Sequence, residues 1–318
     1  MKKDNNMTEG FPSAKVIAHS KAPSGEELIT MEIELHRFVL PEFNTHRCFS
    51  RNFQSSRAVP VSKMIEQVKM KPAFPVHIGV NQRGMVADKE LTGVDKHNAE
   101  HEWLMAAKNA AKTAEVMDKM GIHKQVVNRI LEPFMKTKGV VTSTKEGFES
   151  FFKLRSHKDA QPEIKELSDK MLAAVADSDP VELKYGEYHL PYVDWTSDEE
   201  GIYFIGDSFN IKTVEEAIKV SSSCCAQVSY RVLDDSLEKA IKIYDMLNLP
   251  KKGVYSEDPP HFSPTEHVAK VVDNSFTEVY SSSTRSDAVD QSGNFNSVEF
   301  IQYRKCLELG NEGYFIDQ

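Results

Sequence analysis

The sequence predicts an α+β domain that is rich in helices. One segment alternates apolar and polar residues, several longer segments carry apolar residues at helical spacing, and proline or glycine separates them. The chain has 318 residues, of which 40% are hydrophobic and 27% are charged. It can therefore bury a substantial core, in one large domain or in two ordinary ones.

The first regular element is a strand over residues 28–39. Its apolar positions are Ile29, Met31, Ile33 and Leu35, and polar residues stand between them, as in a strand with one buried face. Pro41 can open a short helix after this strand, and Pro60 opens a longer helix that reaches about Met70. One face of this longer helix is apolar and consists of Val61, Met64, Ile65 and Val68. Residues 71–96, which contain several prolines and glycines, are predicted to form a long loop.

Helices dominate the rest of the chain. They are expected at about 98–119, before Pro133, after a capping box at Ser143–Glu146, from Pro162 onward, at 213–226 after a second capping box, and at 236–247. In the helix after Glu146, the side chains of Phe148, Phe151, Phe152 and Leu154 are expected to face inward. Residues 177–212 are predicted to hold a hairpin, residues 249–264 a loop, and the part after 273 is weakly patterned as far as Phe300.

Bulk properties exclude several classes of function. The net charge of −9 argues against broad nucleic-acid binding, which needs a basic surface. The longest apolar runs are too short to span a bilayer, and the polar N-terminus contains no secretory signal. Four cysteines without metal-binding or disulfide spacing indicate a reduced, cytoplasmic protein with no membrane partner.

The residues from Thr45 to Arg57 form the most informative stretch. They include three arginines, a histidine, an asparagine, a glutamine and three serines, but no lysine or glutamate. Arginine forks and serine hydroxyls are the groups that bind a phosphate ester. The stretch therefore predicts a phosphate site, with a polar loop held by structural arginines as the alternative.

Other chemical groups were weighed against structural roles. His97 and His101 match the spacing of an inverted zinc-peptidase motif, but a helical wheel directs both away from the apolar stripe, which favours a solvated helix face over a metal site. Cys48 could be a nucleophile beside arginines. Arg129 and Arg155 each stand beside apolar residues and should meet an anion, either a ligand or an ion-pair partner such as Glu132 or Glu163. The basic patch from Gln302 to Lys305 is interpreted as solvated, with a patch that lines a site as the alternative.

Taken together, these segments resemble the flavin-dependent thymidylate synthases. Thr45-His-Arg-x-x-Ser50-x-Asn52-x-x-Ser55-Ser56-Arg57 resembles the family signature, and Arg129-Ile-Leu-Glu-Pro133 and Leu154-Arg155 with Ala160-Gln161-Pro-Glu163-Ile164 resemble two later blocks. Cys225-Ala-Gln-Val-Ser229-Tyr and Ser263-Pro-Thr-Glu266-His267 resemble blocks that precede the signature in the family, yet they follow it here. The order suggests a circularly permuted relative of the phage type, because such rearrangement is tolerated when native termini lie close together.

The resemblance implies an α+β fold with a mixed or antiparallel sheet and several long helices. It implies a single catalytic domain over 14–272, with insertions near 71–96 and 177–212 and a C-terminal extension over 273–318. The implied reaction is methylation of dUMP to dTMP, with FAD as cofactor, NADPH and methylenetetrahydrofolate as co-substrates, and a homotetramer as the assembly. Alternatives are a dUMP hydroxymethylase, another enzyme that modifies C5 of a pyrimidine nucleotide, and a relative that binds nucleotide or serves assembly without catalysis.

The resemblance also assigns roles to residues. Ser55, Ser56, Arg57 and Arg129 would hold the nucleotide phosphate, Arg155 would be the catalytic group that polarises the uracil, and His46, Arg47 and Ser263 would contact FAD. No metal is implied. The chain departs from the family at Thr45 and Phe53, where an arginine and a glutamate are expected, and at Glu42, where a glutamine is expected. Arg155→Ala should abolish turnover.

Overall fold

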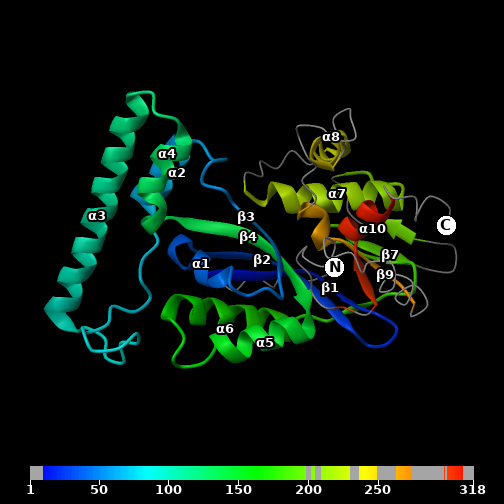
Figure 1. The fold of residues 1–318 in the computed structure, drawn as a ribbon, viewed down its shortest axis with the longest axis horizontal. Coiled ribbons are helices and arrows are strands. Elements are labelled where there is room, and N and C mark those ends of the chain that lie inside the picture. Colours follow the sequence, from blue (N-terminus) through cyan, green and yellow to red (C-terminus); the bar gives the residue numbers. More distant parts are fainter. Residues whose placement is uncertain are drawn as a thin grey trace.

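The computed structural model describes residues 10–197, 202–204, 209–229, 236–248, 263–273, 297 and 299–310. A five-stranded sheet with strand order β3-β4-β2-β1-β5 runs through its centre (Figure 1). The strands are β1 (Ser13–Lys21), β2 (Glu27–His36), β3 (Ser50–Phe53), β4 (Lys136–Thr144) and β5 (Val181–Glu182). The β1–β2, β2–β4 and β3–β4 pairs are antiparallel and the β1–β5 pair is parallel. The α+β class with a mixed sheet is therefore confirmed.

Strand β2 is the strand predicted from the alternating pattern. It ends at His36, and the 3-10 turn η1 (Arg37–Val39) and the short helix α1 (Leu40–Phe43) follow, the latter with Pro41 in its first turn. The four apolar side chains predicted to face inward, Ile29, Met31, Ile33 and Leu35, lie in the main core, as expected. The polar face is also covered in part, because Thr30 is 0% exposed and contacts His189. The expectation of a half-buried strand is therefore wrong at Thr30.

Helices α5 (Lys145–Arg155) and α6 (Pro162–Ala176) cover one face of the sheet (Figure 1). The three phenylalanines of α5 are buried as predicted, whereas Leu154 is 60% exposed, so its predicted inward direction is wrong. The helix is capped by the hydroxyl of Thr144, which accepts from the Gly147 N–H. The predicted cap Ser143 instead donates to the carbonyl oxygen of Cys48 at 2.7 Å and so anchors the loop before β3.

Helices α2 (Val61–Met70), α3 (Gly93–Lys119) and α4 (Lys124–Leu131) pack together beyond one end of the sheet (Figure 1). Their shared core includes the predicted apolar face of α2 and the alanines Ala107, Ala111 and Ala114 of α3. Helix α3 begins at Gly93, five residues before the predicted start, so the preceding loop is shorter than expected. The 3-10 turn η2 (Glu132–Phe134) leads from α4 into β4.

The C-terminal half covers the other face of the sheet. Its elements are β6 (Tyr188–His189), the hairpin β7 (Trp195–Ser197) and β8 (Ile202–Phe204), α7 (Val214–Ala226), η3 (Gln227–Ser229), α8 (Leu237–Asn248), η4 (Ser263–His267), β9 (Ala269–Val271), β10 (Phe300–Gln302) and α10 (Tyr303–Gly310). The hairpin and the Thr213–Glu216 capping box are confirmed. Strands β10, β9 and β6 form a small second sheet. Most of the predicted 249–264 loop lies outside the described residues.

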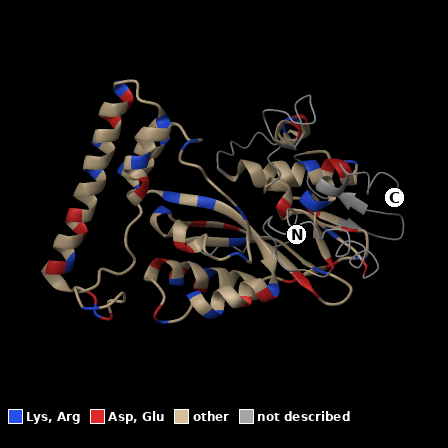
Figure 2. Ribbon diagram, in the orientation of Figure 1, with Lys and Arg blue, Asp and Glu red and all other residues tan. Residues whose placement is uncertain are grey.

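Charge is mixed over the described elements. Acidic and basic residues are interspersed along α3, α5 and α6 (Figure 2). Among the described residues, no helix combines the length and the apolar character that a membrane crossing requires.

Candidate functional site

The motif from Thr45 to Arg57 folds into a loop, the edge strand β3 and a turn. Strand β3 pairs with β4, with Ser50 opposite Thr142 and Phe53 opposite Gly139. The Asn52 side chain donates to the carbonyl oxygen of Cys225 at 2.8 Å, which attaches the motif to the end of α7. The polar residues of β3 thus fix the strand, and the residues on either side of it remain available for a site.

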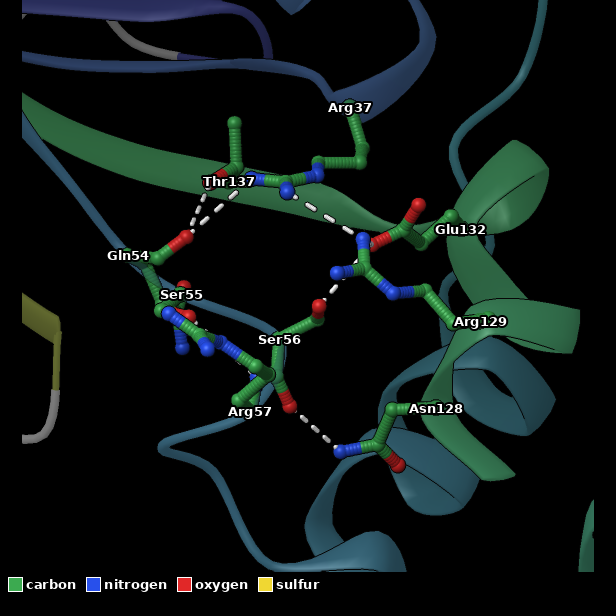
Figure 3. A network of polar contacts seen from close by, with 9 residues as sticks. All are labelled: Arg37, Gln54, Ser55, Ser56, Arg57, Asn128, Arg129, Glu132 and Thr137. Atoms are coloured by element: carbon green, nitrogen blue, oxygen red, sulfur yellow. Dashed lines mark hydrogen bonds and ion pairs between the residues drawn. The ribbon is translucent and has the colours of Figure 1, made fainter. Parts of the chain in front are cut away.

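A cluster of anion-binding groups follows β3 (Figure 3). The Ser56 hydroxyl donates to Oε1 of Glu132 at 2.8 Å. Nη1 of Arg129 donates to the same oxygen at 2.8 Å, and Nη2 of Arg37 forms an ion pair with it at 3.5 Å. Ser56, Arg129, Arg37 and Glu132 are called the phosphate cradle below, after the phosphate site that the sequence predicts for this motif.

The backbone of the phosphate cradle is held from beneath. Asn128 is 0% exposed, and its amide donates to the carbonyl oxygens of Ser56 at 2.7 Å and of Val59 at 3.1 Å. Beside it, the backbone N–H of Arg57 donates to the Ser55 hydroxyl at 3.3 Å (Figure 3). The Arg57 side chain is exposed, so it can swing toward an incoming anion.

Arg129 does have the ion-pair partner that the sequence suggested, Glu132. The Arg129 side chain is 54% exposed, however, so the pair is not a buried one. Helix α4 turns Val127 and Leu131 inward and leaves Arg129 at the rim. Such an exposed pair is weak, and a ligand with more charge can compete for the arginine.

Arg155 lies elsewhere, at the last turn of α5, and contacts His46. Its Nε–H donates to Nε2 of His46 at 2.7 Å, and the imidazole packs edge-on against Phe151 with ring centroids 4.8 Å apart. Burial, and then the charges of Arg155 and Arg51, lower the pKa of His46 to about 4. His46 is therefore neutral at physiological pH and can accept the Arg155 hydrogen.

Arg155 also borders a cavity of about 1190 Å³. Residues of the predicted 71–96 insertion form one wall, among them Val76, His77 and Asp88, and the segment from Lys158 to Asp169 forms another. Glu163 is not the ion-pair partner of Arg155, because its carboxylate accepts the Val76 N–H at 3.0 Å and so ties the insertion to α6. Glu42, which was expected near a phosphate site, lines this cavity instead.

The residues assigned to the flavin meet around β3. Arg47 is exposed. Burial, and to a smaller extent the charge of Arg47, lowers the pKa of the nearby Arg51, whereas the Glu266 carboxylate acts in the opposite direction. Arg51 donates to the carbonyl oxygen of His46 at 2.9 Å and remains charged at neutral pH. Arg51 thus has an acidic neighbour in Glu266, whereas Arg47 is exposed. An exposed arginine is a group that suits a phosphate of a diphosphate such as that of FAD.

Ser263 begins η4, and this turn packs against β3. The Glu266 carboxylate in the same turn pairs with Arg304, and its backbone carbonyl accepts from the Gln302 amide at 3.2 Å. Gln302 also donates to the Ser50 hydroxyl of β3 at 2.6 Å and is 2% exposed. The interpretation of Gln302–Lys305 as a solvated patch is therefore wrong for Gln302. Its isolation in a weakly patterned tail concealed this role.

The departures from the family pattern have structural roles here. Thr45 donates to the carbonyl oxygen of Glu42 at 2.7 Å and completes the turn after α1. Phe53 packs on Phe43 and covers Gly139, where an added Cβ would lie 2.2 Å from the Phe53 ring. Burial raises the pKa of the Cys48 thiol, which disfavours the nucleophilic thiolate.

The structure brings the predicted site residues together in two groups rather than one. Ser55, Ser56, Arg57 and Arg129 gather at the phosphate cradle, and His46 contacts Arg155, which borders the cavity. Within the described part of the chain, neither a hydrogen bond nor an ion pair links Arg155 to the cradle. Sequence reasoning did not identify Arg37 as a member of the cradle. Its place directly after β2 was the available signal.

The zinc-peptidase alternative has no support. His97 and His101 are exposed on α3. No group of three or more metal-binding side chains occurs among the residues that the structure describes.

Known proteins show what this chain resembles. Two solved structures are of a UMP/dUMP methylase, PolB, from Streptomyces cacaoi: the complex with 5-Br dUMP matches with 19% identity and a TM-score of 0.41 over 48% of this chain and 67% of the other. The complex with 5-Br UMP matches with 16% identity and a TM-score of 0.41 over 52% of this chain and 88% of the other. Thymidylate synthase X from Helicobacter pylori with FAD and dUMP matches with 18% identity and a TM-score of 0.33 over 46% and 67%.

No curated protein sequence matches the chain. The sequence model of the thymidylate synthase complementing proteins, however, matches residues 18–181. This range contains the motif, the phosphate cradle, His46 and Arg155, and it spans just over half of the chain. The chain therefore belongs to the thymidylate synthase complementing protein family, a family of enzymes.

Proposed function

We propose that this enzyme methylates dUMP at C5 in a flavin-dependent reaction, with methylenetetrahydrofolate as the carbon donor and NADPH as the reductant. The observation that carries the proposal is the family match over residues 18–181, which contains both the phosphate cradle and the Arg155–His46 pair. FAD-bound and dUMP-bound structures of Thymidylate Synthase X agree with this choice of cofactor and substrate.

The site residues have separate roles in this proposal. Ser55, Ser56, Arg57 and Arg129 bind the 5′-phosphate. Arg155, held by neutral His46 through Nε, directs its remaining N–H groups toward the pyrimidine. A guanidinium there stabilises the negative charge that spreads over the ring when C5 attacks an electrophile. His46, Arg47 and Ser263 hold FAD, which supplies the hydride when bound in its reduced form.

A neighbouring subunit completes the site in this proposal. The phosphate cradle and Arg155 lie in separate groups within one chain. A homotetramer can place the cradle of one subunit beside the cavity of another. Contacts between early and late segments support the circular permutation that we propose. The turn η4 and the end of α7 come late in the chain and pack against the early motif.

Release of tritium from C5-labelled dUMP tests the reaction. We expect release that depends on methylenetetrahydrofolate, FAD and NADPH, and a purified protein that absorbs near 450 nm when FAD is bound. Methylene transfer without NADPH oxidation would show a hydroxymethylase instead. A protein that neither binds FAD nor releases tritium would contradict the proposal and favour a relative without catalysis. Arg155→Ala should abolish release, and retained wild-type activity would refute its role.

A further inference from the structure

Glu132 stands where a phosphate would be expected. Three donors of the phosphate cradle converge on its Oε1 atom: the Ser56 hydroxyl at 2.8 Å, Arg129 at 2.8 Å and Arg37 at 3.5 Å (Figure 3). A hydroxyl and two guanidinium groups are a donor set that suits a phosphate oxygen. A carboxylate accepts the same hydrogens. The three donors of the phosphate cradle therefore already bind an anion that belongs to the protein itself, the Glu132 carboxylate.

The surroundings of Glu132 allow this anion to be exchanged. The Glu132 side chain is 25% exposed and that of Arg129 is 54% exposed, so solvent and ligands reach the pair. The Ser56 backbone is fixed by buried Asn128, so only side chains need to rotate. A phosphate monoester carries up to two negative charges against one on the carboxylate, and it offers three oxygens to the same donors.

We propose that Glu132 is a specificity-determining residue whose carboxylate acts as a resident counter-anion that the substrate phosphate displaces. The inference rests on the proposed function, because it takes the phosphate cradle to be the nucleotide phosphate site. It predicts selection for nucleotides with a terminal phosphate monoester. A nucleoside without phosphate leaves Glu132 in place and gains nothing from Ser56 or Arg129.

The substitution Glu132→Gln tests this directly. Glutamine keeps the length and an oxygen acceptor for Ser56 but removes the charge that holds the two arginines. We expect the Kd of inorganic phosphate and of dUMP to fall roughly tenfold, since exposed and half-buried ion pairs of this kind are each modest. The Kd of deoxyuridine, measured by calorimetry in the same way, should not change.

Glu115→Gln is the matched control. Glu115 lies on α3, pairs with Lys69 and has no contact with the phosphate cradle, yet its substitution changes the net charge equally. It should bind phosphate as the wild type does. Tighter binding in both variants would mean that only overall charge matters and would overturn the proposal. Unchanged or weaker phosphate binding in Glu132→Gln alone would show Glu132 to be a structural partner of Arg129.

A second variant at the same position keeps the proposal testable if Glu132→Gln does not fold. Glu132→Asp keeps the charge and withdraws it by one methylene, and its phosphate affinity should lie between those of the wild type and the glutamine variant. Affinity at or below that of the wild type would count against displacement. Failure of the proposed function looks different: the wild type would bind inorganic phosphate, with the expected response to Glu132→Gln, but would not bind dUMP or release tritium.

Discussion

Among the residues that the structure describes, His46 is the hydrogen-bond partner that orients the Arg155 side chain. His46 accepts from Nε of Arg155, and it can do so because burial and nearby arginines hold its pKa at about 4. A protonated imidazole has no lone pair to offer. The role of His46 is therefore to remain neutral and to orient the permanently charged guanidinium of Arg155.

A pair of His46 variants tests this role. His46→Leu removes the acceptor and should reduce C5 tritium release by roughly 10- to 100-fold, the loss expected for a charge-assisted hydrogen bond worth about 1.5–3 kcal/mol. His46→Gln, which retains an acceptor oxygen, should recover much of this activity. Activity is measured with FAD bound in each variant, so that a loss of FAD binding does not enter the comparison. Equal losses in both variants would then indicate that the imidazole contributes only packing against Phe151.

Five buried side chains link elements that are distant in sequence. The contacts run from Ser20 to His189, from His189 to Thr30, from Thr30 to Thr142 and from Thr142 to His267, each at 2.7 or 2.8 Å. They tie β1, β6, β2 and β4 to η4, the turn that begins with Ser263. All five side chains are buried, and within the described ranges of the chain Nε2 of His267 has no hydrogen-bond partner.

Thr142→Val should destabilise the protein by about 1–3 kcal/mol, because it removes the partner of buried His267 Nδ1 and one of the two partners of the Thr30 hydroxyl while it preserves the side-chain shape. Thr30→Val should have a similar effect. The double variant should cost less than the sum, since the Thr30–Thr142 bond can be lost only once. Urea unfolding of the four proteins measures the difference, and strictly additive costs would mean that the two hydroxyls act independently.

The stability of the whole molecule should depend on pH through buried histidines. Burial lowers the pKa of His189 and of His267 to about 3, against an ordinary value of 6.5. Between these values the unfolded chain binds a proton at each histidine and the folded chain does not. Stability is therefore complete above about pH 6.5 and falls as pH decreases toward 3, by about 1.4 kcal/mol per pH unit for each group.

His189→Gln removes one of these two titrations and leaves the other. The free energies of unfolding of the wild type and the variant, measured in urea between pH 7 and pH 5, should converge by about 1.4 kcal/mol per pH unit below pH 6.5. Profiles that remain parallel would show that His189 takes up a proton in the folded state.

The sequence indicated the elements with strong periodicity and missed those without it. The apolar face of α2 and the capping box of α7 were predicted residue by residue, because helical spacing and capping chemistry are local signals. Strand β4 was missed because it is buried along both faces and its sequence shows no alternation. Its Gly139 leaves room for the ring of Phe53, which a side chain at this position would meet. Strand β1 was also not predicted from the sequence, and its register with β2 is irregular between Val16 and Ala18.

The candidate site shows the same division. The motif, Arg129 and Arg155 were found because their residue types are chemically unusual in their places. The partners that hold them, Arg37 for the phosphate cradle and Gln302 for β3, come from segments whose proximity only the fold reveals. A sequence pattern shows the chemistry of single residues well, but it does not show which distant segments of the chain will contact each other.

The contacts that complete β3 also bear on how the enzyme is made. Asn52 bonds to a residue 173 positions later, and Ser50 to one 252 positions later. At ribosomal rates of about 5–20 residues per second, Gln302 follows Ser50 by roughly 13 to 50 s. Closing such long loops also slows folding. The motif is thus among the first parts synthesised and among the last to be completed, so a nascent chain should acquire nucleotide binding only after its C-terminal strand has left the ribosome.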